Sequence, residues 1–144
     1  MAEVRKSALV PHSAGQMYAL VNDVDAYAEF LPWCRSSRVV TLTGDGYIGE
    51  IEVAKAGIVQ SFQTRNILIP EEQVRISLEK GPFRHLHGDW NFIPLRADAS
   101  KVELTLEFEF TGKLMNAAFG AVFSQIANNM VDAFCKRAGE VYGK

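Results

Sequence analysis

Three short patterns in the sequence place residues of chemical interest at regular spacing. Residues 44–49 read G-x-G-x-x-G, the pattern of loops that hold the pyrophosphate of a dinucleotide. Such a loop needs a strand before it and a helix after it, because the helix N-terminus binds the phosphates. Here the following residues alternate between apolar and polar, which predicts a strand. We therefore interpret residues 44–49 as a hairpin turn with glycines at positive φ.

His85, His87 and Asp89 are two residues apart, so on one strand all three project from the same face. Two imidazoles and one carboxylate resemble a metal-binding triad. The intervening Leu86 and Trp90 are apolar, however, and if they face the core the histidines face solvent. The sequence thus favours a solvated strand face over a metal site.

No set of residues stands out for nucleophilic or acid–base catalysis. There is no G-x-S-x-G motif, and Cys34 and Cys135 are far apart, with no neighbouring base. Cysteines so placed suggest neither a zinc site nor a disulfide. Paired acids such as Glu107 and Glu109 are expected on outward strand positions, where they more often solubilise than catalyse. We therefore expect a protein that binds, without catalysis, metal or a required cofactor.

Length and composition narrow the class of protein further. The chain has 144 residues, 48% of them hydrophobic, so we expect one domain spanning residues 1–144. A formal net charge of −2 argues against a general polyanion binder, and we expect no DNA binding and only local contact with other nucleic acids. Neither a signal peptide nor a run of roughly 18 apolar residues is present, which predicts a cytoplasmic protein.

The elements that position these residues follow from hydrophobic periodicity. Residues 4–10 are typical of a first strand, and Ser13 with Gln16 forms a capping box that starts a helix. A second short helical turn over residues 23–30 is ended by Pro32. From residue 38 to 110 the period is two, which predicts successive antiparallel strands. It is clearest at Val102, Leu104, Leu106, Phe108 and Phe110.

After Gly112 the apolar residues return to helical spacing, which predicts a helix of about 25 residues, roughly 38 Å long. The positions that recur at steps of three and four are Leu114, Ala117, Ala121, Val122, Gln125, Ile126, Asn129, Met130, Ala133 and Phe134. The order of elements predicts an α+β fold, a curved antiparallel sheet of about seven strands around this long helix, with two short helices after the first strand. A bent sheet around one helix tends to leave an apolar space for a small ligand.

Large apolar side chains are more numerous than one helix-on-sheet layer requires, and we expect them to line this cavity. The candidates are Phe30, Leu31, Trp33, Phe62, Trp90, Phe92, Phe108, Phe110, Phe119, Phe123 and Met130.

Several segments of the chain resemble the coenzyme Q-binding START-like family of the SRPBCC superfamily. They include residues 30–34 (FLPWC), 55–58 (KAGI), 81–83 (GPF) and 108–110 (FEF), and they match most closely its bacterial branch, the ribosome association toxins. The likeness covers nearly the whole chain. Tyr27-Ala28 departs from the tyrosine-proline usual in the family.

The resemblance implies a START-like helix-grip fold and two activities, neither of them catalytic. For the bacterial branch it implies binding to the large ribosomal subunit, which blocks subunit joining and inhibits translation initiation, and it raises the question of an antitoxin partner. For the mitochondrial branch it implies binding of ubiquinone in support of respiration. A third and less favoured activity, that of a polyketide cyclase or aromatase, needs an acid or base inside the cavity, and the sequence singles out none.

The two activities predict different sites. Ribosome binding predicts exposed cations that contact RNA phosphates, and the candidates are Lys55, Arg65, Arg84 and Lys113. Binding of ubiquinone or another isoprenoid lipid predicts an apolar cavity whose entrance involves the turn from Phe30 to Trp33.

Overall fold

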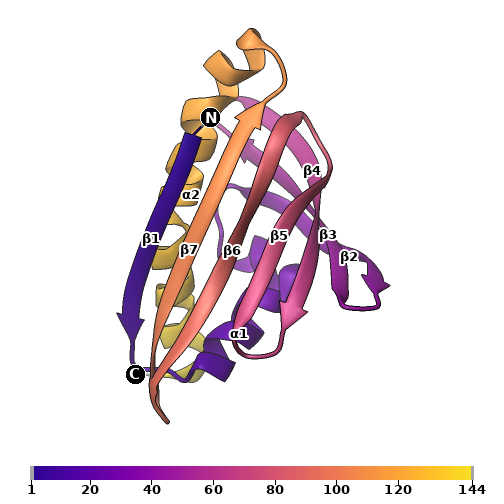
Figure 1. Cartoon of the computed structure of the whole chain (residues 1–144). Coiled ribbons are helices and arrows are strands. Elements are labelled where there is room, and N and C mark those ends of the chain that lie inside the picture. The colour runs from indigo at the N-terminus through magenta and orange to yellow at the C-terminus, as the bar shows by residue number, and fades with distance from the viewer. Residues whose placement is uncertain (1, 144) are drawn as a thin grey trace.

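The computed structural model describes residues 2–143, which form one curved antiparallel sheet and three helices (Figure 1). In chain order the elements are β1 (Ala2–Val10), α1 (Ala14–Asn22), the 3-10 helix η1 (Val24–Glu29), β2 (Cys34–Thr43), β3 (Gly46–Lys55), β4 (Ile58–Ile69), β5 (Gln73–Lys80), β6 (Phe83–Arg96), β7 (Ala99–Phe110) and α2 (Lys113–Tyr142). The predicted α+β helix-grip arrangement of seven strands and a long final helix is confirmed.

The strands lie in the order β1-β7-β6-β5-β4-β3-β2, and every neighbouring pair is antiparallel. The first strand therefore pairs with the last, with Val4 opposite Leu106 and Val10 opposite Ser100. Register shifts interrupt the β2–β3, β4–β5 and β6–β7 ladders. Such bulges bend a strand and increase its twist. They account for the curl of the sheet around α2, which packs against β1 and β7 (Figure 1).

Side-chain burial in the strands confirms the predicted period of two. Along β7, the apolar residues from Val102 to Phe110 are buried and the residues between them are partly exposed. In β6, Leu86 and Trp90 are buried while His85 and His87 are exposed. The histidines therefore lie on the outer face of the sheet, as expected.

Helix α2 is longer than predicted, and its buried stripe is placed differently. It has 30 residues, which is about 45 Å, because the stripe continues past Phe134 to Ala138. Half of the ten positions predicted to form the buried stripe are exposed: Leu114, Ala117, Ala121, Gln125 and Asn129. The start of the helix extends beyond the end of the sheet (Figure 1), and Leu114 is 88% exposed there, whereas Met115 packs against the core. Burial begins at Phe119.

The start of α1 matches the predicted capping box. The Ser13 Oγ accepts a hydrogen bond from the Gln16 backbone N at 3.1 Å, and the Ser13 backbone N donates to the Gln16 Oε1 at 2.9 Å. The buried face of the helix carries Met17, Leu20 and Val21. Within residues 2–143, none of the helices is long and apolar enough to cross a membrane.

The hairpin predicted at residues 44–49 is present, but its glycines do not adopt positive φ. The next hairpin does contain left-handed backbone, because Ala56 (φ 54°) and Gly57 (φ 78°) join β3 to β4. Gly46 is required by close approach instead, because a Cβ there would lie 1.8 Å from the Asn66 carbonyl oxygen. A strand, β3, follows the glycines, so the helix that a dinucleotide site requires is missing at this point.

Candidate ligand cavity

A cavity of about 90 Å³ lies between the inner face of the sheet and α2. This volume would hold several water molecules, at about 10–15 Å³ each. Its wall is mostly apolar and draws on every strand except β1 and β2. Five of the predicted cavity residues lie in the wall: Trp33, Phe62, Trp90, Phe123 and Met130. The rest of the wall consists of residues that were not predicted from the sequence: Val21, Val24, Tyr27, Tyr47, Gly49, Ile51, Thr64, Asn66, Val74, Ile76, Leu86, Leu106 and Ile126.

Three of the other predicted residues, Phe108, Phe110 and Phe119, lie outside the wall in a packed aromatic cluster. The ring of Phe110 stacks on Phe83 with centroids 4.4 Å apart, and Phe119 contacts Phe110 at 4.9 Å. Phe123 joins the cluster to the cavity, with its ring 4.8 Å from Phe108. These rings fill the space between sheet and helix where β7 ends and α2 begins.

Phe30 and Leu31 also lie outside the cavity wall, and they fix the turn that covers it. The Leu31 side chain, which belongs to this turn, is buried and only 1% exposed. Phe30 packs against Phe134 of α2 at 5.2 Å, and the Arg137 guanidinium lies 5.1 Å from the centre of the Phe30 ring. Arg137 also pairs with Glu29 at 3.0 Å. The turn is therefore held to α2 by an aromatic contact, a cation–π contact and an ion pair.

The covering turn positions Trp33, which lies in the cavity wall. The backbone carbonyl of Trp33 accepts a hydrogen bond from the Ala54 N at 2.9 Å, which ties the end of the turn to β3. The last predicted residue, Phe92, lies outside the wall. Its ring is stacked beside Trp90 with centroids 6.3 Å apart, and it meets Tyr18 of α1 edge-on. Phe92 thus packs against Trp90, a residue of the wall, without lining the cavity itself.

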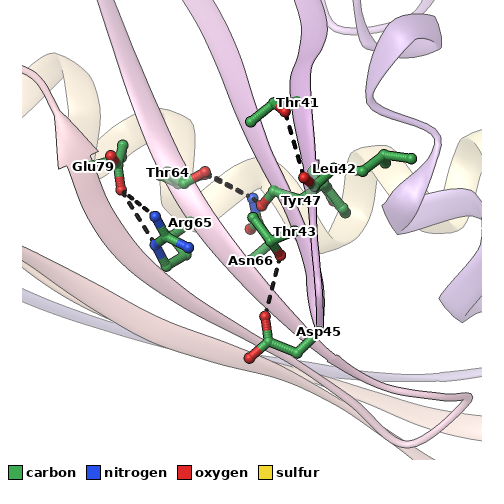
Figure 2. A network of polar contacts seen from close by, with 9 residues as sticks. All are labelled: Thr41, Leu42, Thr43, Asp45, Tyr47, Thr64, Arg65, Asn66 and Glu79. Atoms are coloured by element: carbon green, nitrogen blue, oxygen red, sulfur yellow. Dashed lines mark hydrogen bonds and ion pairs between the residues drawn. The ribbon is translucent and has the colours of Figure 1, made fainter.

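One side of the cavity is polar, because β4 places Thr64 and Asn66 on the inner face (Figure 2). The Asn66 Nδ2 donates to the Thr64 Oγ1 and to the Thr64 carbonyl, both at 3.1 Å. The Tyr47 hydroxyl, also in the wall, donates to the Asn22 Oδ1 at 3.0 Å. Two polar residues at inward positions of an otherwise alternating strand are a signal that sequence reasoning could have used.

The phenols of Tyr27 and Tyr47 are the ionisable groups in the described wall. Burial raises the pKa of both, with nearby groups adding to the effect. Each phenol therefore keeps its proton at ordinary pH and acts as a hydrogen-bond donor. The Tyr27 hydroxyl donates to the Val21 carbonyl. Both protons are thus already engaged by the protein.

Groups with catalytic potential lie elsewhere or are deactivated by their surroundings. Burial raises the pKa of the Cys34 and Cys135 thiols, which leaves them weakly nucleophilic at neutral pH. On the outer face, His87 pairs with Glu107 at 3.2 Å. Within residues 2–143, no group of three or more His, Cys, Asp or Glu side chains could hold a metal ion.

The predicted cationic candidates divide into two groups. Arg65 lies in the middle of β4, where its Nη2 is 3.3 Å from the Glu79 Oε1, on the side opposite Asn66 (Figure 2). Lys55 ends β3, Arg84 lies near the start of β6 and Lys113 begins α2. Because the strands alternate in direction, these last three positions share one end of the sheet.

Comparison with known proteins identifies a family model and relatives that match nearly the whole chain. Residues 10–135 match the family model described as polyketide cyclase/dehydrase and lipid transport. The ribosome association toxin RatA of Escherichia coli K12 is 48% identical over 142 residues, covering 99% of this chain and 90% of that protein. The coenzyme Q-binding protein COQ10 homolog B of Xenopus laevis is 33% identical, covering 99% of this chain and 60% of that protein.

Among solved structures, the Zhui aromatase/cyclase from Streptomyces superimposes with a TM-score of 0.83, covering 95% of this chain and 93% of that one. Its sequence identity is 19%, so this likeness concerns the fold alone.

The buried phenol of Tyr47 predicts a dependence of stability on alkaline pH. Above a pKa of about 10, the unfolded chain loses a phenolic proton that folded Tyr47 keeps. The unfolded state then binds fewer protons, so the free energy of unfolding falls as pH rises. Urea denaturation between about pH 8 and pH 11 should therefore show that the free energy of unfolding falls less steeply with pH in a Tyr47→Phe variant than in the unaltered chain.

The same variant should lose about 1 kcal/mol at neutral pH, because its hydrogen bond to Asn22 is removed. Tyr142→Phe, which alters a more exposed phenol, is the control and should change the slope less. An alkaline slope in Tyr47→Phe equal to that of the unaltered chain would contradict the prediction.

Proposed function

The chain belongs to the polyketide cyclase/dehydrase and lipid transport family, in the branch that contains RatA, and on this premise we propose that it associates with the ribosome through the large subunit. The observation that carries the proposal is identity of 46–49% to proteins named RatA or PasT, along 97–100% of the chain. The action is binding: occupying the joining surface of one subunit blocks the other and inhibits translation initiation.

Ribosomal RNA presents a dense array of phosphates, so association requires cations that no carboxylate in the protein neutralises. Such contacts release counterions, and the affinity falls steeply with added salt. The formal net charge of −2 does not oppose this, because a local group of cations creates a positive field at one part of an acidic chain.

Sedimentation through a density gradient tests the association directly. We expect the purified chain to comigrate with isolated large subunits at about 50 mM salt and to be released at about 200 mM. With as few as three phosphate contacts, this change lowers the affinity roughly 30-fold. Isolated small subunits are the control and should not carry the chain. Absence from the large-subunit fractions at the lower salt concentration would refute the proposal.

The cavity favours a second role, binding of a ubiquinone or another apolar lipid with a polar head. A quinone carries hydrogen-bond acceptors and no donor, so it needs a donor in the wall. The Thr64 hydroxyl accepts from Asn66 and, within the described chain, its own proton has no acceptor. It is therefore the group that would donate to a quinone carbonyl, while Trp33 and Trp90 would contact the ring.

A cyclase or aromatase activity has less support. Such a reaction needs an acid or base that faces the cavity, and among the described wall residues the ionisable groups are the two phenols, whose pKa burial raises.

Tryptophan fluorescence provides a direct measure of quinone binding, because both tryptophans of the chain lie in the cavity wall. We expect a short-chain ubiquinone to quench the emission in a saturable manner. Ile76→Phe, which fills the cavity, should weaken binding about 5- to 150-fold, since overpacking costs about 1–3 kcal/mol. Ile93→Phe makes the same exchange on the exposed end of β6 and should bind as the unaltered chain does. Equal quenching of both variants would contradict the cavity as the site.

A further inference from the structure

Arginines on the outer face of the sheet are neutralised by acids on neighbouring strands. Arg35 pairs with Glu52 at 3.4 Å and Arg38 with Glu50 at 3.0 Å. Further along, Arg84 lies 3.5 Å from Glu109. These cross-strand pairs leave the broad outer surface close to neutral, with little charge available for a partner.

Three lysines differ from these arginines, because they form no ion pair within the described chain. Lys55 ends β3, Lys80 ends β5 and Lys113 begins α2 directly after β7. The strands β3, β5 and β7 run in the same direction, since each is separated from the next by one antiparallel strand. The three lysines therefore occupy backbone positions at the same end of the sheet. Helix α2 also begins at this end (Figure 1).

The opposite end of the sheet carries carboxylates without a cationic partner among the described residues. Asp45 lies in the turn between β2 and β3, and Glu71 and Glu72 lie in the turn between β4 and β5. These turns are at the far end from the lysines, because they precede β3 and β5. The three unpaired lysines thus lie at one end of the strands, and these three unpaired carboxylates lie at the other.

We propose that the lysine end, defined by Lys55, Lys80 and Lys113, is the surface that meets ribosomal RNA. The inference rests on the proposed ribosome association and adds to it the face and the orientation. A chain with this charge separation turns its positive end towards a polyanion as it approaches, and its acidic end is repelled. The N-terminal end of α2 adds to the positive field, because the helix dipole places partial positive charge there. No acidic residue in its first turn offsets this charge.

The separation also changes which of the sequence-based candidates contact RNA. Arg65 and Arg84 each form an ion pair with a glutamate, so a carboxylate of the protein largely neutralises their charge. Lys80, which was not a candidate, is exposed at the end of β5. The ammonium groups of Lys55, Lys80 and Lys113 are therefore the phosphate contacts.

Two triple variants with the same loss of charge test the proposal. One is K55Q/K80Q/K113Q at the lysine end, and the matched control is K6Q/R75Q/K136Q, which removes cations that form no ion pair elsewhere on the described chain. Affinity for purified large subunits is measured as a function of salt concentration. We expect the first variant to bind at least about tenfold more weakly at low salt and to lose about 2–3 from the slope of log K against log salt. For the control variant, the slope of log K against log salt should fall by less than about 1.

Several outcomes overturn the proposal, and they are distinguishable from failure of the proposed function. If the unaltered chain binds large subunits but both variants change equally, the lysine end is not the contact surface. If the unaltered chain does not bind, ribosome association itself fails. Loss of binding by K55Q/K80Q/K113Q to anionic phospholipid vesicles, with subunit binding intact, would assign this end to a lipid surface and overturn the proposal.

A folding control keeps these results interpretable. Both triple variants should unfold in urea at the midpoint of the unaltered chain, because surface substitutions seldom change stability. Should the midpoint of the first variant fall, K80Q/K113Q replaces it, since both of those residues are exposed. Its slope should then fall by about 1.5–2, and an unchanged slope contradicts the proposal.

Discussion

A single helix packed on the inner face of a strongly bent sheet is the constraint on which the remaining structure depends. Helix α2 contacts β1 and β7, where the inward residues Leu104 and Phe108 are fully buried. It does not reach β3, β4 and β5 as closely, and the inward residues Ile51 and Ile76 there are only half-buried. Interiors otherwise pack to the density of organic crystals. The cavity is thus the volume that one cylinder leaves beneath a curved surface.

Different groups lie at the two ends of this volume, and they limit what it can bind. The aromatic cluster around Phe83 and Phe110 fills the end where α2 begins. The turn that carries Trp33 covers the cavity near the C-terminal half of α2. Contacts of Phe30 with Phe134 and Arg137 hold this turn to the helix. Between them lie apolar walls and one polar side, Thr64 with Asn66. This arrangement suits a molecule with an apolar body and a polar group, and it offers no reactive carboxylate or imidazole among the described wall residues.

Much of the fold follows from the sequence, because the patterns that determine it are local. The alternation along β7 and the capping box at Ser13 each predicted an element that the structure contains. Which aromatic residues line the cavity and which fill the core depends on the curvature of the sheet, and part of that curvature arises from bulges at long-range pairings such as Phe83/His85 against β7. The same holds for the start of α2, where Leu114 was predicted to be buried and is 88% exposed. Charge separation along the strands becomes visible only when strand directions are known.

The central structural claim, on which the second proposed role depends, is that the space left beneath α2 is a ligand site. Crystal structures with and without a short-chain ubiquinone test it most directly. We predict electron density for the quinone ring between Trp33 and Trp90, with one carbonyl within hydrogen-bonding distance of the Thr64 hydroxyl. Side chains that fill this space in the ligand-free crystal, or a ring bound only at the outer surface, would contradict the account.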